Sequence, residues 1–133
     1  MQRTHFLNVD LDIYSNRDLH PLVKRLGRKV IVLHLGRERG QFSAHLEQNI
    51  VRGRTADSAI RAFCRLIEKL PPAERVLWNT AAVRSFSIGI QAGARPNPRD
   101  FTIRPKTVQA VSAVGADIVI TIYAPENGKA SQE

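Results

Sequence analysis

The sequence predicts a two-layer α+β sandwich: a mainly antiparallel sheet, helices on one of its faces, and a ferredoxin-like arrangement of the elements. Three observations predict this class. Segments of alternating apolar and polar residues are interleaved with segments that carry one apolar stripe, in the order β-α-β-β-α-α-β-β-α-β. Tight turns join some successive strands, which favours antiparallel pairing. The helices have one apolar face each, so each needs only one sheet face to cover.

The first strand, helix and second strand have clear boundaries in the sequence. Apolar and polar residues alternate over residues 7–13, which predicts a strand with one buried face. Pro21 has no amide hydrogen to donate and so belongs in a first helical turn, which favours Asp18 as the N-cap. Gly27 ends this helix. The nearly continuous apolar run over residues 30–35 predicts a strand in the interior of the sheet.

A hairpin and the longest helix follow. Glycines bracket residues 36–40, which predicts a tight connection to a third strand over residues 42–46. Thr55 is a good N-cap for a helix over residues 56–70, whose apolar residues recur at helical spacing. Pro71 and the proline after it end that helix and begin a shorter one.

The last part of the chain predicts strand, strand, helix and strand. Alternation over residues 85–90 indicates a fourth strand, and shorter alternation over residues 101–103 indicates a fifth. Pro105 is suited to the first turn of a helix that ends at Gly115. Isoleucines then alternate with other residues over 118–122, so one face of the final strand is strongly apolar.

Parts of this chain resemble a family of small bacterial domains of unknown function. The resemblance lies in residues 101–123, where a proline-started helix ends in glycine before a strand that closes on Ile122 and Tyr123, and in residues 18–27, which resemble the family's first helix. It implies a helix packed on a sheet. It implies no activity, because the shared motifs specify packing.

Length and composition predict one domain over residues 1–125 and a disordered polar tail over residues 126–133. No apolar run is long enough to span a membrane, and the start of the chain lacks the apolar core of a signal peptide. Cys64 is the single cysteine, so no internal disulfide is expected. We therefore expect a cytoplasmic protein without a membrane partner.

The formal net charge is +8, from 20 Lys and Arg against 12 Asp and Glu. Such a surplus favours nucleic acid or another polyanion as a partner, because each neutralised phosphate releases counterions. However, the basic residues are scattered along the chain. Aromatic residues make up only 6% of it, which argues against a surface on which bases stack.

The start of the last helix is a candidate site for a phosphate-type anion. Its expected N-cap, Arg104, cannot accept hydrogen bonds from the helix amides, and Lys106 adds a second cation near the positive end of the helix dipole. A bound anion would accept hydrogen bonds from the helix amides and would attract both cations, so both unfavourable effects would become favourable. Arg95 and Arg99 lie in the preceding loop and could reach the same place. The alternative is that these side chains simply point into water.

A second basic grouping is a candidate contact for nucleic acid. It consists of Arg37 and Arg39 at the predicted hairpin tip and Arg52 and Arg54 before the longest helix. Residues two apart on an extended segment point the same way, so each pair presents a double charge. The alternative is that these residues keep a strand edge soluble and unpaired.

Signals for catalysis are weak. Asp10 and Asp12 share one strand face, and with His34 or His45 they could bind a metal or act as acid and base. The alternative is a solvated strand face, because no spacing matches a metal motif and the two histidines lie on neighbouring strands where their side chains need not converge. Cys64 is expected to be buried and unreactive. We assign no catalytic residue, metal or cofactor.

The leading hypothesis is a non-catalytic binding or protein-interaction module of regulatory or immunity type, which acts through its sheet face or an exposed edge strand. An unidentified protein is the favoured partner, and a homodimer is compatible with the pattern. A nucleic-acid or polyanion binder is the second hypothesis. A metal- or carboxylate-dependent enzyme is the third and least favoured.

Overall fold

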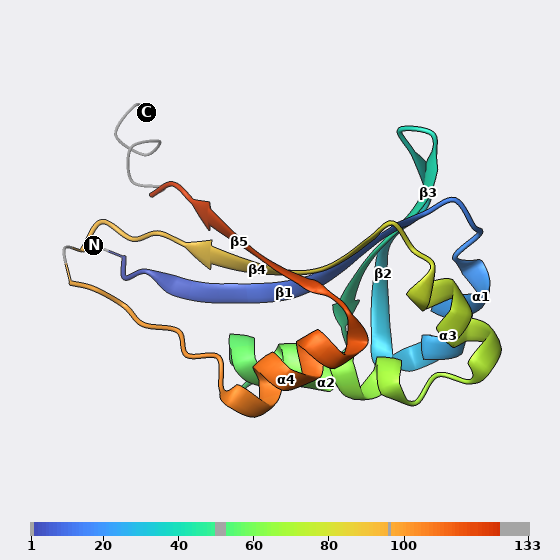
Figure 1. The fold of residues 1–133 in the computed structure, drawn as a ribbon. Coiled ribbons are helices and arrows are strands. Elements are labelled where there is room, and N and C mark those ends of the chain that lie inside the picture. The colour runs from blue at the N-terminus through green and yellow to red at the C-terminus, as the bar shows by residue number, and fades with distance from the viewer. Residues whose placement is uncertain (1, 50–52, 96, 126–133) are drawn as a thin grey trace.

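A computed structural model describes residues 2–49, 53–95 and 97–125. A five-stranded sheet forms one layer, and the helices lie together on one of its faces (Figure 1). This confirms the predicted α+β class. The predicted tail, residues 126–133, lies outside the described residues. No helix in the described ranges is long and apolar enough to cross a lipid bilayer.

In each strand successive side chains point to opposite faces of the sheet, and each helix buries the side chains along one of its faces. The strands are β1 (His5–Ser15), β2 (Val30–Glu38), β3 (Gln41–Gln48), β4 (Val83–Gln91) and β5 (Asp117–Tyr123). The helices are α1 (His20–Leu26), α2 (Ala56–Glu68), α3 (Pro72–Asn79) and α4 (Pro105–Val114). A short 3₁₀ turn, Gly27–Lys29, follows α1.

The strand order across the sheet is β2-β3-β1-β4-β5. The first four strands pair antiparallel, and β1 and β3 are the central strands of that group. This order, with helices between β1 and β2 and between β3 and β4, is the predicted ferredoxin-like arrangement. Strand β5 is an addition to it, paired parallel with β4 at one edge of the sheet.

The prediction of a strand over residues 101–103 is wrong, because these residues form no strand. Parallel pairing of β4 with β5 requires the chain to return along the sheet between them. The segment that follows β4 makes this return on the helical side (Figure 1). Phe101 and Ile103 alternate because they pack against the core, where both are half-buried.

The core lies between the sheet and α2. Thr55 accepts a hydrogen bond from the amide of Ser58, whose side chain accepts one from the amide of Thr55, so a reciprocal capping box fixes the start of α2. Phe63 of α2 stacks on Phe86 of β4, with ring centroids 5.8 Å apart. Trp78 of α3 is fully buried and donates its indole N–H to the carbonyl oxygen of Val114, 2.8 Å away.

The start of α1 differs slightly from the prediction. The helix begins at His20, and Leu19, not Asp18, is its N-cap residue. Asp18 still satisfies the first turn, because its Oδ1 accepts from the backbone amide of His20 at 3.0 Å. The predicted role of this carboxylate is therefore kept, one position before the cap.

Candidate interaction surface

Strand β5 is almost entirely apolar, and every one of its residues is exposed. Ile120 is 60% exposed and Ile122 66%. We call its five large apolar side chains the β5 surface: Ile118, Val119, Ile120, Ile122 and Tyr123. An exposed, regular apolar strand at a sheet edge offers unpaired backbone groups and apolar area to another chain.

The isoleucines of β5 continue the core face of the sheet beyond the layer that covers it. They pair in register with buried residues of β4: Ile118 with Phe86, Ile120 with Ile88, and Ile122 with Ile90. Paired residues of neighbouring strands point to the same side of a sheet, so the isoleucines face the helical side.

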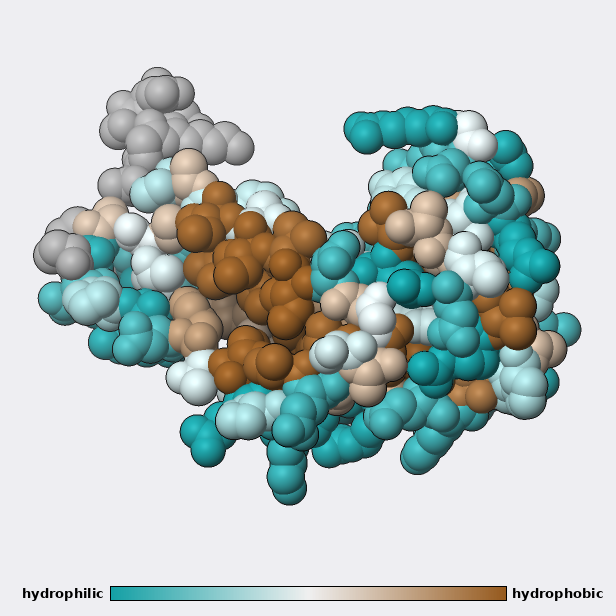
Figure 2. All heavy atoms as spheres, viewed as in Figure 1, coloured by the Kyte–Doolittle hydropathy of each residue, from teal (hydrophilic) through white to brown (hydrophobic). Residues whose placement is uncertain are grey.

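They stay exposed because α4 packs against α2 and leaves most of β5 uncovered. Figure 2 shows hydrophobic side chains gathered over β5 and again over the helices below it, with a hollow between them. Val108 of α4 is 52% exposed, so this helix also presents an exposed apolar side chain. The surface is therefore apolar both along the strand and beneath it.

The opposite edge of the sheet is β2, so the prediction that residues 30–35 form a strand in the interior of the sheet is wrong. This edge is built differently from β5. It also exposes apolar residues, but a β-bulge at Leu33 interrupts its ladder with β3. Arg37 and Glu38 place charges toward its end. Bulges and charges are the usual means of blocking edge-to-edge pairing. Strand β5 has neither over its paired residues after Asp117, and among the described residues no strand pairs with its outer edge.

The face of the sheet away from the helices, the open face, carries a polar network that crosses four strands. Glu38 of β2 lies 2.6 Å from Nε2 of His45 on β3, and Nδ1 of His45 lies 2.7 Å from Asp12 of β1. Ser87 of β4 donates to the other oxygen of Asp12 at 2.7 Å. With an acid at each nitrogen, the ring of His45 is set to donate from both.

The two histidines do converge, contrary to the expectation that their side chains need not meet. The bulge at Leu33 shifts the phase of β2 by one residue, so His34 is directly opposite His45. Their ring centroids are 5.4 Å apart. A bulge has no clear signature in this stretch of sequence, so the pairing of the two histidines could not be predicted from it.

Asp10 and His45 on the open face have shifted pKa values. Burial, together with the negative charges of Glu47 and Asp12, raises the pKa of Asp10 from 3.8 to about 6. Partial burial alone would lower the pKa of His45, but its hydrogen bonds and ion pairs with Asp12 and Glu38 outweigh burial and raise it. Within the described ranges, no group of His, Cys, Asp and Glu side chains has the geometry to bind a metal ion.

A carboxylate of the protein itself lies at the start of α4, where an anion was expected. The N-cap of α4 is Arg104, as predicted, and its backbone amide donates to Oδ1 of Asp57 in α2 at 2.7 Å. Arg61 holds the other oxygen of Asp57 at 3.0 Å. Burial would raise the pKa of Asp57, but these bonds and a hydrogen bond from Thr107 lower it overall.

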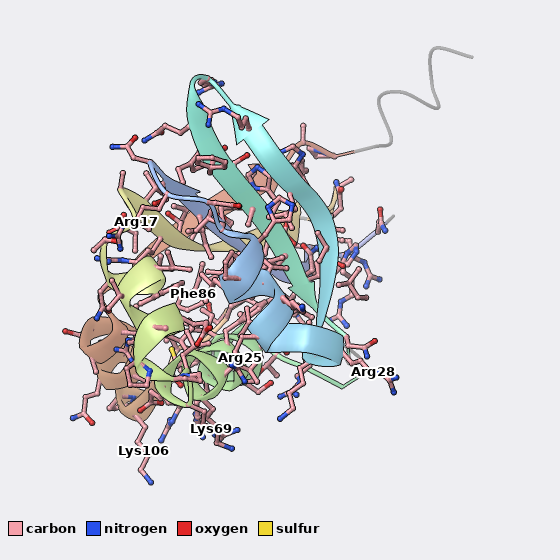
Figure 3. The ribbon with its side chains drawn as sticks, turned by 90° about the vertical axis from the view of Figure 1, so that its right-hand side faces the viewer. Arg17, Arg25, Arg28, Lys69, Phe86 and Lys106 are labelled. Carbon is pink, nitrogen blue, oxygen red and sulfur yellow. The ribbon has the colours of Figure 1, made fainter. Side chains whose placement is uncertain are left out.

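The other residues predicted for the anion site do not all lie at the start of α4. Arg99 and Arg104 line a cavity of about 580 Å³ between the N-terminal segment and α2. Arg99 also lies over the ring of Phe101, 6.0 Å from its centroid. Arg95 is exposed in the loop after β4, and Lys106 points into solvent (Figure 3).

The second basic grouping divides between two parts of the molecule. Arg37 and Arg39 lie at the β2–β3 hairpin, where the guanidinium of Arg37 stacks over Phe42 and donates to the carbonyl oxygen of Gly40. Arg54 lines the cavity that Arg99 and Arg104 also line, and it lines a second cavity of about 290 Å³ beside α2. Arg52 lies outside the described residues.

Cys64 is fully buried, and burial raises its thiol pKa to about 11. The residue therefore behaves as the predicted small hydrophobe.

Comparison with protein-family models, with curated proteins and with solved structures found no match.

Sequence reasoning identified β5 as a strand with an apolar face but did not identify it as a surface. The missing information was that α4 would leave the strand uncovered. One signal was present: after Asp117 the strand contains no charged residue on either face. Edge strands usually carry a charge or a proline that blocks pairing with another chain. Six residues without a charge therefore indicate an edge that is open to pairing.

Proposed function

We propose that this chain is a non-catalytic protein-interaction module that binds its partner through the β5 surface. The observation that carries the proposal is an apolar edge strand that is uncharged after Asp117 and has every residue exposed. A partner that adds a strand to β5 would satisfy its outward backbone groups and pack its own side chains beside the isoleucines. Burial of a large apolar side chain stabilises a complex by about 1.5–3 kcal/mol before association costs are subtracted.

The polar network on the open face supports a structural reading better than a catalytic one. Ser87 donates to Asp12 and not to the histidine, so its hydroxyl is not set up as a nucleophile. Both nitrogens of His45 already face carboxylates, so the ring has no nitrogen directed at a substrate. The network links four strands and holds the sheet in register.

Capture from native lysate tests the proposed function. The tagged chain would be compared with Ile120→Arg, which places a charge in the β5 surface, and with Leu33→Arg, which places one at the opposite edge. Leu33 is 51% exposed, so both substitutions start from exposed aliphatic residues. At about 0.15 M salt with nuclease, we expect retained proteins to be lost from Ile120→Arg and kept by Leu33→Arg. Equal retention by both variants would contradict the proposal.

A second candidate function is polyanion binding on the helical side. Arg28, Lys29 and Arg54 line the cavity of about 290 Å³ beside α2. Figure 3 shows Arg28, Lys69 and Lys106 directed away from the helical layer, whereas Phe86 lies inside the molecule. Arg25 instead lies 3.7 Å from the carboxylate of Glu74 in α3. The open face is unsuited to a polyanion because it carries an acidic cluster: Asp10, Asp12, Glu38 and Glu47.

Salt dependence distinguishes the two functions. For polyanion binding, affinity for a labelled oligonucleotide should fall steeply as salt is raised, and Arg28→Glu should weaken binding while Ile120→Arg leaves it unchanged. Binding through the β5 surface should tolerate salt and show the reverse pattern. The two variants therefore separate the functions in one set of titrations.

A further inference from the structure

We infer that the partner of β5 is a second copy of this chain, paired antiparallel through β5 with Ile120 opposite Ile120. The inference rests on the proposed function and names its partner. Strand β5 is complementary to itself in apolar pattern and in charge. The result is a symmetric dimer with one continuous ten-stranded sheet, twice the five strands of one chain.

The register follows from the length of the strand. β5 spans Asp117–Tyr123, so its middle residue is Ile120. A two-fold axis at Ile120 uses every residue of the strand and sets Ile118 opposite Ile122. Directly opposed residues in an antiparallel pair point to the same side of the sheet. All six isoleucines of the two copies therefore meet on the helical side, where each copy leaves them exposed.

The other side of the paired strands is also complementary. Val119 of one copy is opposite Thr121 of its partner, which matches two β-branched side chains of similar size. Asp117 is opposite Tyr123, so a carboxylate meets a phenol that can donate a hydrogen bond to it. The two Asp117 residues lie at opposite ends of the interface, six residues apart along the ladder, about 20 Å.

Charge leaves β5 as an edge at which a second copy can approach. The molecule carries a net charge of +8, so two copies repel over most of their surfaces. The strand itself bears a single charge, and that charge is negative. β5 is therefore an edge at which two copies can approach without placing cations against cations.

The symmetry also places the helical layers favourably. A two-fold axis through paired edges stands perpendicular to the sheet, so the helices of both copies lie on one side. The hollow beneath β5 in Figure 2 then becomes shared between the copies. A seven-residue edge gives an interface at the small end of the specific range, so we expect a reversible dimer whose population depends on concentration.

Sedimentation velocity tests the assembly. From about 1 µM to about 200 µM, the wild-type chain should shift from the sedimentation coefficient of a monomer to that of a dimer. Ile120→Arg should remain monomeric over the same range, because it would bring two arginines face to face at the axis. Leu33→Arg, the matched change on β2, should dimerise as the wild type does. Circular dichroism of each variant confirms that it is folded.

Single cysteines test the register. At Ile120→Cys the two introduced thiols would lie on opposed residues with Cα atoms about 4.5–5.5 Å apart, within the range a disulfide can bridge. At Ile118→Cys the two thiols would be four residues out of register, about 13 Å apart, and should not cross-link. The double variant with Ile118→Cys and Ile122→Cys should cross-link again. Cys64 is fully buried and serves as an unreactive background.

The outcomes separate this inference from the proposed function. A wild-type chain that stays monomeric at every concentration overturns the dimer. If Ile120→Arg still loses captured proteins that Leu33→Arg keeps, the proposed function stands with a different partner. If the wild type is monomeric and the capture patterns are equal, both fail. A dimer that persists in Ile120→Arg, or that cross-links through Ile118→Cys alone, overturns the interface assigned here.

Discussion

Replacing Asp10 by asparagine should stabilise the protein above neutral pH. Asp10 lies on the open face with Asn8 donating to it at 3.2 Å, and its pKa is raised to about 6 by burial and by nearby Glu47 and Asp12. The folded state therefore binds this proton more tightly than the unfolded chain does. Ionisation of Asp10 as pH rises from 3.8 through 6 costs stability, and the cost is complete above that window.

The size of the effect follows from the shift. A change from 3.8 to about 6 corresponds to at most about 3 kcal/mol at alkaline pH, since each pKa unit is worth about 1.4 kcal/mol. Asp10 is only half-buried, and solvent screening reduces this to about 1–2 kcal/mol. At about pH 4.5 the difference between variant and wild type should fall to about a third of its value at about pH 8.

Urea unfolding at both pH values measures this directly. Asp10→Asn removes the charge and keeps an oxygen that can accept from Asn8. His45 does not confuse the comparison, although its raised pKa also makes stability fall as pH rises through the folded value, because it titrates in both proteins. If the variant were less stable than the wild type at alkaline pH, or shifted equally at both pH values, the account of the open face would be refuted.

Three further substitutions test the packing. Asp57→Ala removes the acceptor of the Arg104 amide and should lower the free energy of unfolding by about 1–2 kcal/mol in urea, with the difference from wild type shrinking in acid because the wild-type carboxylate is then protonated. An unchanged midpoint would show that α4 does not need this carboxylate. Trp78→Phe leaves the carbonyl oxygen of Val114 without its buried donor, and differential scanning calorimetry should show a loss of about 1–3 kcal/mol; an unchanged melting temperature would show that this bond is dispensable. Gly93→Ala would place its Cβ 2.1 Å from a backbone oxygen of the N-terminal segment, so that segment should lose protection from proteolysis; an unaltered cleavage pattern would contradict the close approach of the two backbones.

Local signals predicted most of the fold. The capping box at Thr55 and the alternation in β1 depend only on residues that are close together in the chain. The sequence therefore shows where these elements begin. The failed strand at residues 101–103 had the correct pattern for half-buried side chains. Whether such a segment finds a ladder partner depends on the route of the chain between β4 and β5, which no local pattern records.

The candidate site was harder to predict because it depends on contacts between distant segments. Asp57 reaches Arg104 across 47 residues, so the apparent lack of an N-cap on α4 looked like an external anion site. The exposure of Ile120 depends on α4 packing against α2, and not on the sequence of β5 itself. The bulge at Leu33, which aligns the histidines, also becomes visible only once β2 pairs with β3.

Hydrogen exchange of β5 tests the central claim most directly. The outer edge of the strand has no partner strand in the described chain, so its outward amides should exchange rapidly in dilute protein. As concentration is raised, or as a captured partner is added, a peptide covering Asp117–Tyr123 should gain protection while one covering β2 does not. Exchange from β5 that stays the same with concentration and with every added partner would contradict its role as the interaction surface.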